Sequence, residues 1–156
     1  KKHMTHKFFA ITSAAILLTL GATNSNAATE ESKIIGKWES EVTFMQPEKF
    51  HVTINKCDND PAKLCGKLSW PEKREQEHMD KDAGKDYRQP GFNVLKDFSP
   101  TEDDNGALVN YDNGVIFDVT NGDSYDSKME YNEDGTLSVS GCILFICQAQ
   151  KWTRLK

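Results

Sequence analysis

The sequence predicts an all-β protein, an antiparallel barrel or sandwich of short strands. Apolar and polar residues alternate with a period of two over most of the chain after residue 36, and glycine-containing turn signals separate the alternating segments. Such alternation indicates strands with one buried face and one solvated face. Short strands joined in chain order by tight turns favour an antiparallel meander that forms a barrel or a sandwich.

Three predicted strands lie in the first half of the chain, at residues 38–44, 50–54 and 64–70. In each of them every second side chain is apolar or small, and we expect this face to line the core. The inward positions are Trp38, Ser40, Val42 and Phe44 in the first strand, Phe50, Val52 and Ile54 in the second, and Leu64, Gly66, Leu68 and Trp70 in the third.

Three further predicted strands cover residues 115–119, 125–131 and 137–141, and a last one contains Trp152 and Arg154. Asn-Gly and Asp-Gly pairs favour tight turns, because both residues tolerate positive φ. The predicted turns are Asp104-Asn105-Gly106, Asn113-Gly114, Asn121-Gly122 and Asp134-Gly135. The inward positions are Val115, Phe117 and Val119, then Tyr125, Ser127, Met129 and Tyr131, then Leu137, Val139 and Gly141.

The N-terminus has the pattern of a secretory signal peptide. Three lysines precede an apolar run at residues 8–20, and small residues lead to a predicted cleavage after Ala27. The run is shorter than the roughly 20 residues of a membrane-spanning helix. We therefore expect a leader at residues 1–27, one domain at residues 28–156 without a membrane span, and a periplasmic or secreted location.

Composition sets limits on function. The 156 residues suffice for one domain, and an aromatic content of 10% favours a packed core over disorder. After removal of the leader, 16 basic and 24 acidic residues remain. An acidic chain without a basic cluster is poorly suited to bind nucleic acid, because phosphate contacts require clustered Lys and Arg.

All four cysteines follow the predicted leader, as two close pairs, Cys57/Cys65 and Cys142/Cys147. An exported chain with an even number of cysteines predicts disulfides, and sequential pairing is favoured because each pair brackets a hairpin-like turn. A zinc site with four cysteine ligands is the alternative. Intervening loops of seven and four residues fit zinc motifs poorly.

The alternation stops between Pro71 and Gly91, where charged residues dominate. We expect a long surface loop, a type of segment that often carries function. Its carboxylates Asp80, Asp82 and Asp86 resemble the start of a calcium loop, but Gly91 occupies the position of the bidentate Glu. A solvated acidic loop is the favoured interpretation, and no metal or cofactor is predicted.

Two features near the chain ends concern barrel closure and surface. If the first and last strands pair, Trp38 and Trp152 help to close the barrel, with the Arg154 guanidinium over the Trp38 ring as a cation–π contact. Residues 143–146 form an apolar hairpin tip, Ile-Leu-Phe-Ile. We expect this tip to fold over the barrel end; a contact with a partner or ligand is the alternative.

Taken together, the motifs resemble those of the exported bacterial domain-of-unknown-function family 2147. The matching segments are Gly36 to Trp38, Leu64 to Trp70, Gly114 to Asp118, Gly122 to Lys128, Leu137 to Cys142 and Gln150 to Arg154. The resemblance implies a small lipocalin-like β-barrel of about eight strands. It implies no particular activity.

The leading functional hypothesis is an exported, non-enzymatic protein that binds a small apolar ligand inside the barrel. Neither His51 nor His78 has a Ser or Cys nucleophile at an interpretable spacing, so no catalytic residue is predicted. The alternative is a protein-interaction or structural module of the cell envelope without an internal ligand, whose partner the sequence does not identify. The predicted ligand-binding residues are Phe44, Phe50, Leu68, Trp70, Phe117, Tyr125 and Met129.

Overall fold

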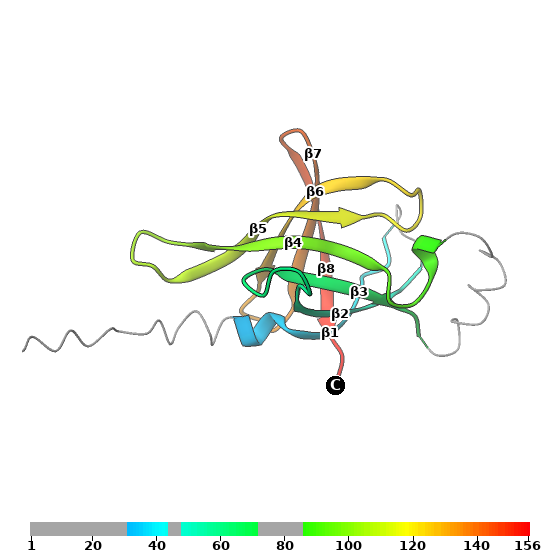
Figure 1. Cartoon of the computed structure of the whole chain (residues 1–156), viewed down its shortest axis with the longest axis horizontal. Coiled ribbons are helices and arrows are strands. Elements are labelled where there is room, and N and C mark those ends of the chain that lie inside the picture. The colour runs from blue at the N-terminus through cyan, green and yellow to red at the C-terminus, as the bar shows by residue number, and fades with distance from the viewer. Residues whose placement is uncertain (1–30, 44–47, 72–85) are drawn as a thin grey trace, which may run out of the picture.

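Eight antiparallel strands close into a barrel in chain order (Figure 1). The computed structural model describes residues 31–43, 48–71 and 86–156, apart from the side chain of Val109. The strands are β1 (Gly36–Glu39), β2 (His51–Lys56), β3 (Leu64–Ser69), β4 (Asn93–Glu102), β5 (Leu108–Phe117), β6 (Ser124–Tyr131), β7 (Leu137–Ile143) and β8 (Ile146–Arg154), with a 3-10 helix η1 (Asp86–Arg88) before β4.

Each strand pairs with the next, and β1 pairs with β8 through Trp38↔Arg154 and Glu39↔Thr153. The meander gives the barrel two ends. The end that carries the helical turn at residues 31–34 and the β2–β3, β4–β5 and β6–β7 connections is called the closed end. The β1–β2, β3–β4, β5–β6 and β7–β8 connections lie at the other end, called the open end.

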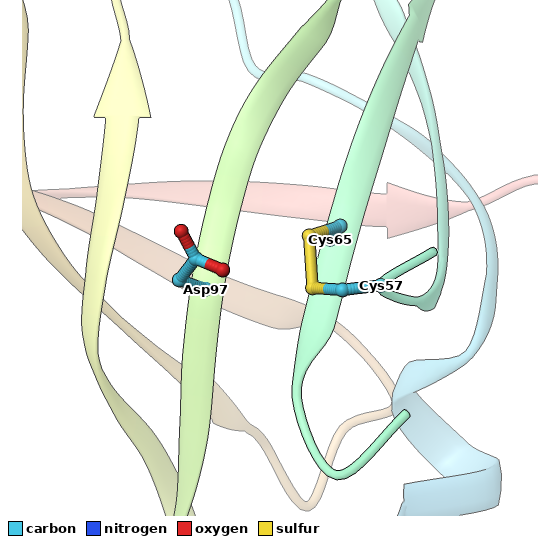
Figure 2. Close-up of side chains that lie close together, drawn as sticks. All are labelled: Cys57, Cys65 and Asp97. Atoms are coloured by element: carbon cyan, nitrogen blue, oxygen red, sulfur yellow. A yellow bond between two sulfur atoms is a disulfide. The ribbon is translucent and has the colours of Figure 1, made fainter. Parts of the chain in front are cut away.

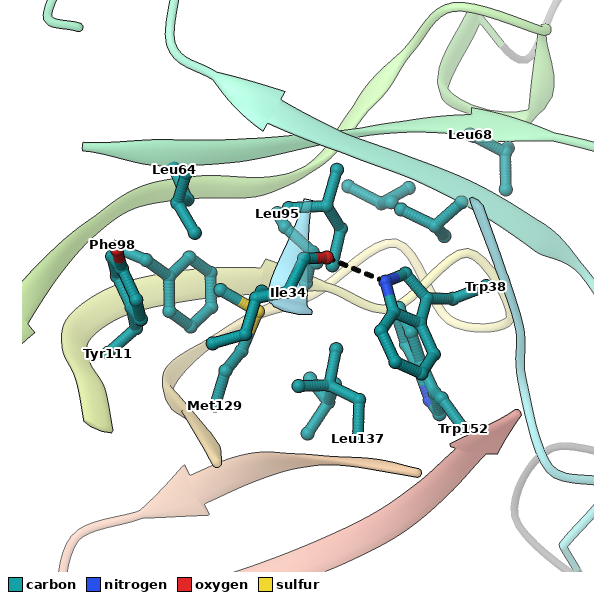
Figure 3. Close-up of a cluster of buried hydrophobic side chains, with 14 of the residues drawn as sticks. Ile34, Trp38, Leu64, Leu68, Leu95, Phe98, Tyr111, Met129, Leu137 and Trp152 are labelled. Carbon is teal, nitrogen blue, oxygen red and sulfur yellow. Dashed lines mark hydrogen bonds between the residues drawn. The ribbon is translucent and has the colours of Figure 1, made fainter. Parts of the chain in front are cut away.

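The inward-facing apolar side chains of the strands fill the barrel. Figure 3 shows Trp38, Leu64, Leu95, Met129 and Leu137 pointing into one cluster, and each is fully buried. At the closed end, the Trp38 indole N–H donates a 2.8 Å hydrogen bond to the carbonyl of Ile34, which ends the helical turn. The core therefore occupies the closed end and the middle of the barrel.

Three of the predicted turns are present. The connections at residues 103–107, 118–123 and 132–136 contain Gly106, Gly122 and Gly135 with φ of 75°, 85° and 82°. These values lie in the left-handed region that glycine adopts without a Cβ clash. The predicted Asn-Gly pairs and Asp-Gly pair at these three positions thus end strands as expected.

The predicted turn at Asn113-Gly114 is wrong. Both residues lie inside β5, where Asn113 has φ 56° and the pairing with β6 shifts between Tyr111 and Gly114. The extra residue makes a β-bulge, because two residues of one strand oppose one of its neighbour. The bulge reverses the expected faces downstream: Ile116 pairs with Leu95 and points inward, so Phe117 points outward.

The first predicted strand is also shorter than expected. β1 ends at Glu39, and although Ser40 is buried, Val42 is 49% exposed. Val42 therefore lies outside the core that the alternation predicts for it. Phe44 lies outside the described residues.

Candidate functional site at the open end

Aromatic side chains fill one side of the open end. Phe50, just before β2, makes edge-on contacts with Trp70 and Trp152, with ring centroids 6.2 and 5.7 Å apart. All three rings are buried, as is Leu68 two residues before Trp70. Edge-to-face arrangements of this kind are favourable and hold rings in fixed positions. The predicted ligand-binding residues Phe50, Leu68 and Trp70 thus lie together.

The segment that leads from η1 into β4 holds the rim on this side. The Trp70 indole N–H donates to the carbonyl of Arg88 at 3.0 Å, and the Arg88 Nε donates to the carbonyl of Val119 at 2.8 Å. Arg88 therefore connects the end of β3 with the β5–β6 connection. Phe117 packs here, outside the barrel, with its ring 5.2 Å from Tyr87 and 5.0 Å from Phe92.

The opposite wall of the open end carries small side chains. Ser127 of β6 pairs with Gly114 of β5 and Gly141 of β7. A Cβ on Gly114 would collide with the Phe98 ring, so Phe98 already occupies that space. A Cβ on Gly141 would meet Ile116 Cγ2 at 3.5 Å, an ordinary contact. The wall is therefore filled beside Gly114, whereas beside Gly141 it accommodates a methyl group at contact distance.

Solvent reaches the inner wall near Gly141. Ile116 and Tyr125 point inward by their pairing and by their position beside Gly141, yet both are only half-buried. The Tyr125 hydroxyl accepts a 2.9 Å hydrogen bond from Asn121 at the rim. The predicted site residue Met129, by contrast, is completely buried deeper in the barrel. On this face of β6, Tyr125 toward the open end and Tyr131 toward the closed end are half-buried, and the residues between them are buried.

A buried hydroxyl lies next to this accessible wall. Ser127 is 5% exposed, and within the described part of the chain its Oγ has no hydrogen-bond partner. A buried polar atom without a partner costs free energy. The sequence placed Ser127 on the inward face without marking it as functional. The available signal was a small polar residue on an otherwise apolar inward face; the two glycines become its neighbours only through strand pairing.

The opposite, closed end is fastened by the residues predicted for barrel closure. The Arg154 guanidinium carbon lies 4.4 Å from the centroid of the Trp38 ring, and its Nη1 donates to the carbonyl of Ile35 at 3.1 Å. Trp152 lies between the two ends: it is fully buried, its ring contacts Phe50, and its indole N–H donates to Gln150 Oε1 at 3.2 Å.

Perturbed ionisable groups lie outside the accessible wall. The Lys49 ammonium holds the pKa of Glu39 below its usual value, opposed by burial and aided by His51, whose Nε2 lies 3.3 Å from Glu39 Oε2. Burial raises the pKa of Tyr111 to about 12, with a smaller effect from the Glu31 carboxylate. Both shifts are accounted for by packing and pairing, so neither indicates a catalytic acid or base.

The cysteines form two disulfides, Cys57–Cys65 and Cys142–Cys147. Asp97 lies beside the first of these (Figure 2), with all three ligand-type atoms within 4.8 Å of one another. Because the two sulfurs are bonded to each other, they are not thiolate ligands, and Asp97 alone does not make a metal site. Of the calcium-like carboxylates, Asp86 is exposed in η1, and Asp80 and Asp82 lie outside the described residues, as does His78.

A polar groove of about 440 Å³ lies on the outer face of β2, β3 and β4. Its lysines include Lys67, which pairs with Asp58 at 3.0 Å, and Lys56, which pairs with Glu31 at 3.2 Å. Exposed pairs of this kind neutralise each other's charge. The groove therefore lacks the concentrated charge that would select an ionic ligand.

The fold defines a small lipocalin-like protein: eight antiparallel strands form a closed meander around a packed apolar core. The chain belongs to the bacterial family described as "Uncharacterized protein conserved in bacteria (DUF2147)", whose profile matches residues 36–154. This match confirms the resemblance inferred from the sequence motifs. Among curated proteins, no match to the sequence is found.

A solved structure shows the same fold. Protein HP1028 from the human pathogen Helicobacter pylori, described as belonging to the lipocalin family, aligns with a TM-score of 0.57 at 13% identity. The alignment covers 78% of this chain and 82% of HP1028. The predicted barrel of about eight strands is confirmed. At this identity the likeness concerns the fold alone.

Proposed function

We propose that this is an exported, non-enzymatic protein that binds a small apolar ligand at the open end of its barrel. One observation carries the proposal: Ile116 and Tyr125 face the interior and are still accessible, whereas the deeper interior is filled. An apolar chain placed there would gain about 0.8 kcal/mol for each CH₂ removed from water. A chain of several methylenes then binds usefully after the costs of association.

The hydroxyl of Ser127 gives the ligand a polar end. A carboxyl, hydroxyl or carbonyl group on the ligand would supply the hydrogen bond that Ser127 Oγ lacks among the described residues. Apolar pockets with a few placed polar groups are typical of small-molecule sites. The proposed ligand is therefore an amphipathic molecule of the fatty-acid type, with its polar end toward β6.

Export is supported by two features. The leader pattern at residues 1–27 is typical of secretion, and two disulfides are typical of an oxidising compartment. Among the described residues, no helix has the length and apolar character of a membrane span. We expect intact-mass analysis of periplasmic or secreted material to find a chain that begins at Ala28 or Thr29. Retention of residues 8–20 would contradict this.

Titration with an environment-sensitive fluorescent fatty acid tests the binding proposal. Leu68→Trp would narrow the interior, but Leu68 is 1% exposed, so that change would disturb the core itself. Gly141→Val adds bulk beside Ile116 and Tyr125, whose nearest atoms lie 3.5 and 3.7 Å from the position of its Cβ, and should weaken binding at least about tenfold. Ala149→Val on exposed β8 adds similar bulk outside the barrel and serves as the control. No saturable binding by the wild type, or equal binding by both variants, would show that the proposal is wrong.

The envelope-interaction alternative has its own supporting observation. The apolar tip at residues 143–146 does not fold over the barrel end but projects from it, with each side chain at least 64% exposed. Native mass spectrometry separates the two functions, because a co-purifying lipid-sized mass supports the internal ligand. A ligand-free mass in a larger assembly supports an interaction module.

A further inference from the structure

The hairpin of β7 and β8 ends in the largest exposed apolar surface that the described residues contain. Ile143 and Ile146 pair at its end, with 64% and 69% of their surface exposed, and the two turn residues Leu144 and Phe145 are 87% and 88% exposed. Figure 1 shows this hairpin projecting beyond its neighbouring strands. Four adjacent exposed apolar side chains on a soluble domain mark a contact surface.

The backbone of this tip is held in a fixed shape. Cys142 and Cys147 pair directly below it and are joined by a disulfide. Leu144 has φ 55°, in the left-handed region that glycine or asparagine adopts most readily. A leucine at this position costs conformational energy. A glycine would form this turn at lower conformational cost. The leucine therefore contributes through its exposed side chain and not through its backbone conformation.

Charge limits how deep the tip can enter an apolar medium. No charged residue occurs between residues 139 and 150 of a chain that is 28% charged. On the neighbouring strand, exposed Asp126 pairs with Cys142, at the base of the tip. From Cys142 to the turn the strand rises about 7 Å. Interfacial segments bury their apolar faces by about 5–10 Å in the headgroup region of a bilayer, and the tip matches this depth.

We infer that residues 143–146 insert into the surface of a lipid bilayer, with Asp126 marking the depth at which insertion stops. The tip is convex and uncharged, which suits a lipid surface. A basic patch is not needed for a neutral bilayer. Binding is therefore driven by apolar burial, and the acidic chain should bind neutral bilayers better than anionic ones.

Co-sedimentation with phosphatidylcholine vesicles tests the inference on the full-length mature chain. Wild type should bind. Phe145→Glu should reduce partitioning at least about tenfold, because it removes the ring that the bilayer would bury and adds a charge. Val42→Glu is the matched control, since Val42 is 49% exposed outside the tip. Replacing part of the lipid with phosphatidylglycerol should weaken wild-type binding at low salt.

A second variant tests insertion directly. All three tryptophans are at most 6% exposed, so a Phe145→Trp variant carries the one tryptophan of the described residues whose emission reports on the tip. Vesicles should shift its emission to the blue and leave that of the wild type unchanged. Tip-independent binding, binding that increases with anionic lipid, or no binding at all would overturn the inference. So would tip-dependent dimerisation without lipid in sedimentation equilibrium, which would assign the surface to a second copy.

Discussion

The Arg154 guanidinium lies over the Trp38 ring, 4.4 Å from its centroid, and this contact joins the last strand of the barrel to the first. Both residues are also hydrogen-bonded to the segment before β1: Trp38 donates to Ile34 and Arg154 donates to Ile35. One cation–π pair thus fastens the closed end at two strands and at the helical turn that covers it.

A double-mutant cycle on this pair should show coupling. Trp38→Ala is expected to cost about 3–5 kcal/mol in the free energy of unfolding, because it leaves a large cavity in the core. Arg154→Ala should cost about 1–2 kcal/mol through loss of the cation–π contact and of its hydrogen bond. The sum of the two single changes in the free energy of unfolding should exceed the change measured for the double variant. Chemical denaturation measures all four proteins, and strict additivity would contradict an energetic contact.

The two glycines that flank Ser127 should respond differently to the same substitution. Gly114→Ala places a methyl group against the buried Phe98 ring and should cost about 1–3 kcal/mol through overpacking. Gly141→Ala meets Ile116 at an ordinary contact distance and should change stability little. Thermal unfolding of both variants compares them directly. Equal destabilisation would mean that the inner wall is filled on both sides.

Ser127→Ala should stabilise the protein in the absence of ligand by about 1 kcal/mol, since it removes a buried hydroxyl without a partner among the described residues. Ser138→Ala is the control, because Ser138 Oγ accepts a 3.0 Å hydrogen bond from Asn132. Ser138→Ala should lower the free energy of unfolding by a similar amount. If the proposed ligand bonds to Ser127, the same Ser127→Ala change weakens ligand binding while it raises stability, and isothermal titration calorimetry would detect the difference.

The Cys142–Cys147 disulfide should support the hairpin tip. Closing so short a loop restricts the unfolded chain, which corresponds to about 2–3 kcal/mol in the chain-entropy model. Cys142→Ser with Cys147→Ser should lower stability by this amount and should increase amide exchange at residues 143–146. Peptide mapping without reductant should find both sequential disulfides. Unchanged amide exchange would show that strand pairing alone holds the tip.

Asp134 and Lys151 allow a test of local electrostatics. A hydrogen bond from Lys151 at 2.8 Å, followed by bonds from Thr136, lowers the pKa of Asp134 from 3.8 to about 2. Because the folded state favours the ionised form, the pair stabilises the fold above pH 3.8, and this contribution is lost as the pH falls toward 2. Lys151→Met should raise the pKa of Asp134 part of the way to 3.8, as read by NMR titration. The unaltered Thr136 contacts should preserve the rest of the shift.

The sequence predicted the fold well where local chemistry decides it. Gly122 and Gly135 adopt the left-handed turns that their Asn-Gly and Asp-Gly pairs indicate, and the alternation of β2 and β3 matches their buried faces. These features depend on residues adjacent in the chain. A single sequence contains enough information to place them.

The errors arise where neighbouring strands decide the structure. Asn113-Gly114 has the same composition as a turn, but continued pairing with β4 and β6 makes it a bulge. This extra residue places Ile116 on the inward face and Phe117 on the outward face. Phe117 therefore does not lie at the predicted site. The tip at residues 143–146 was expected to be covered because apolar side chains usually are. Nothing in the local pattern shows that its hairpin extends past the strands beside it.

The short first strand has a consequence for how the barrel opens. Among the described residues, β1 and β8 share two residue pairs, whereas β7 and β8 share seven. Local opening follows the path with the fewest bonds to break. The junction between β1 and β8 is therefore the place where the barrel is expected to open first. The contact of Arg154 with Trp38 opposes this opening.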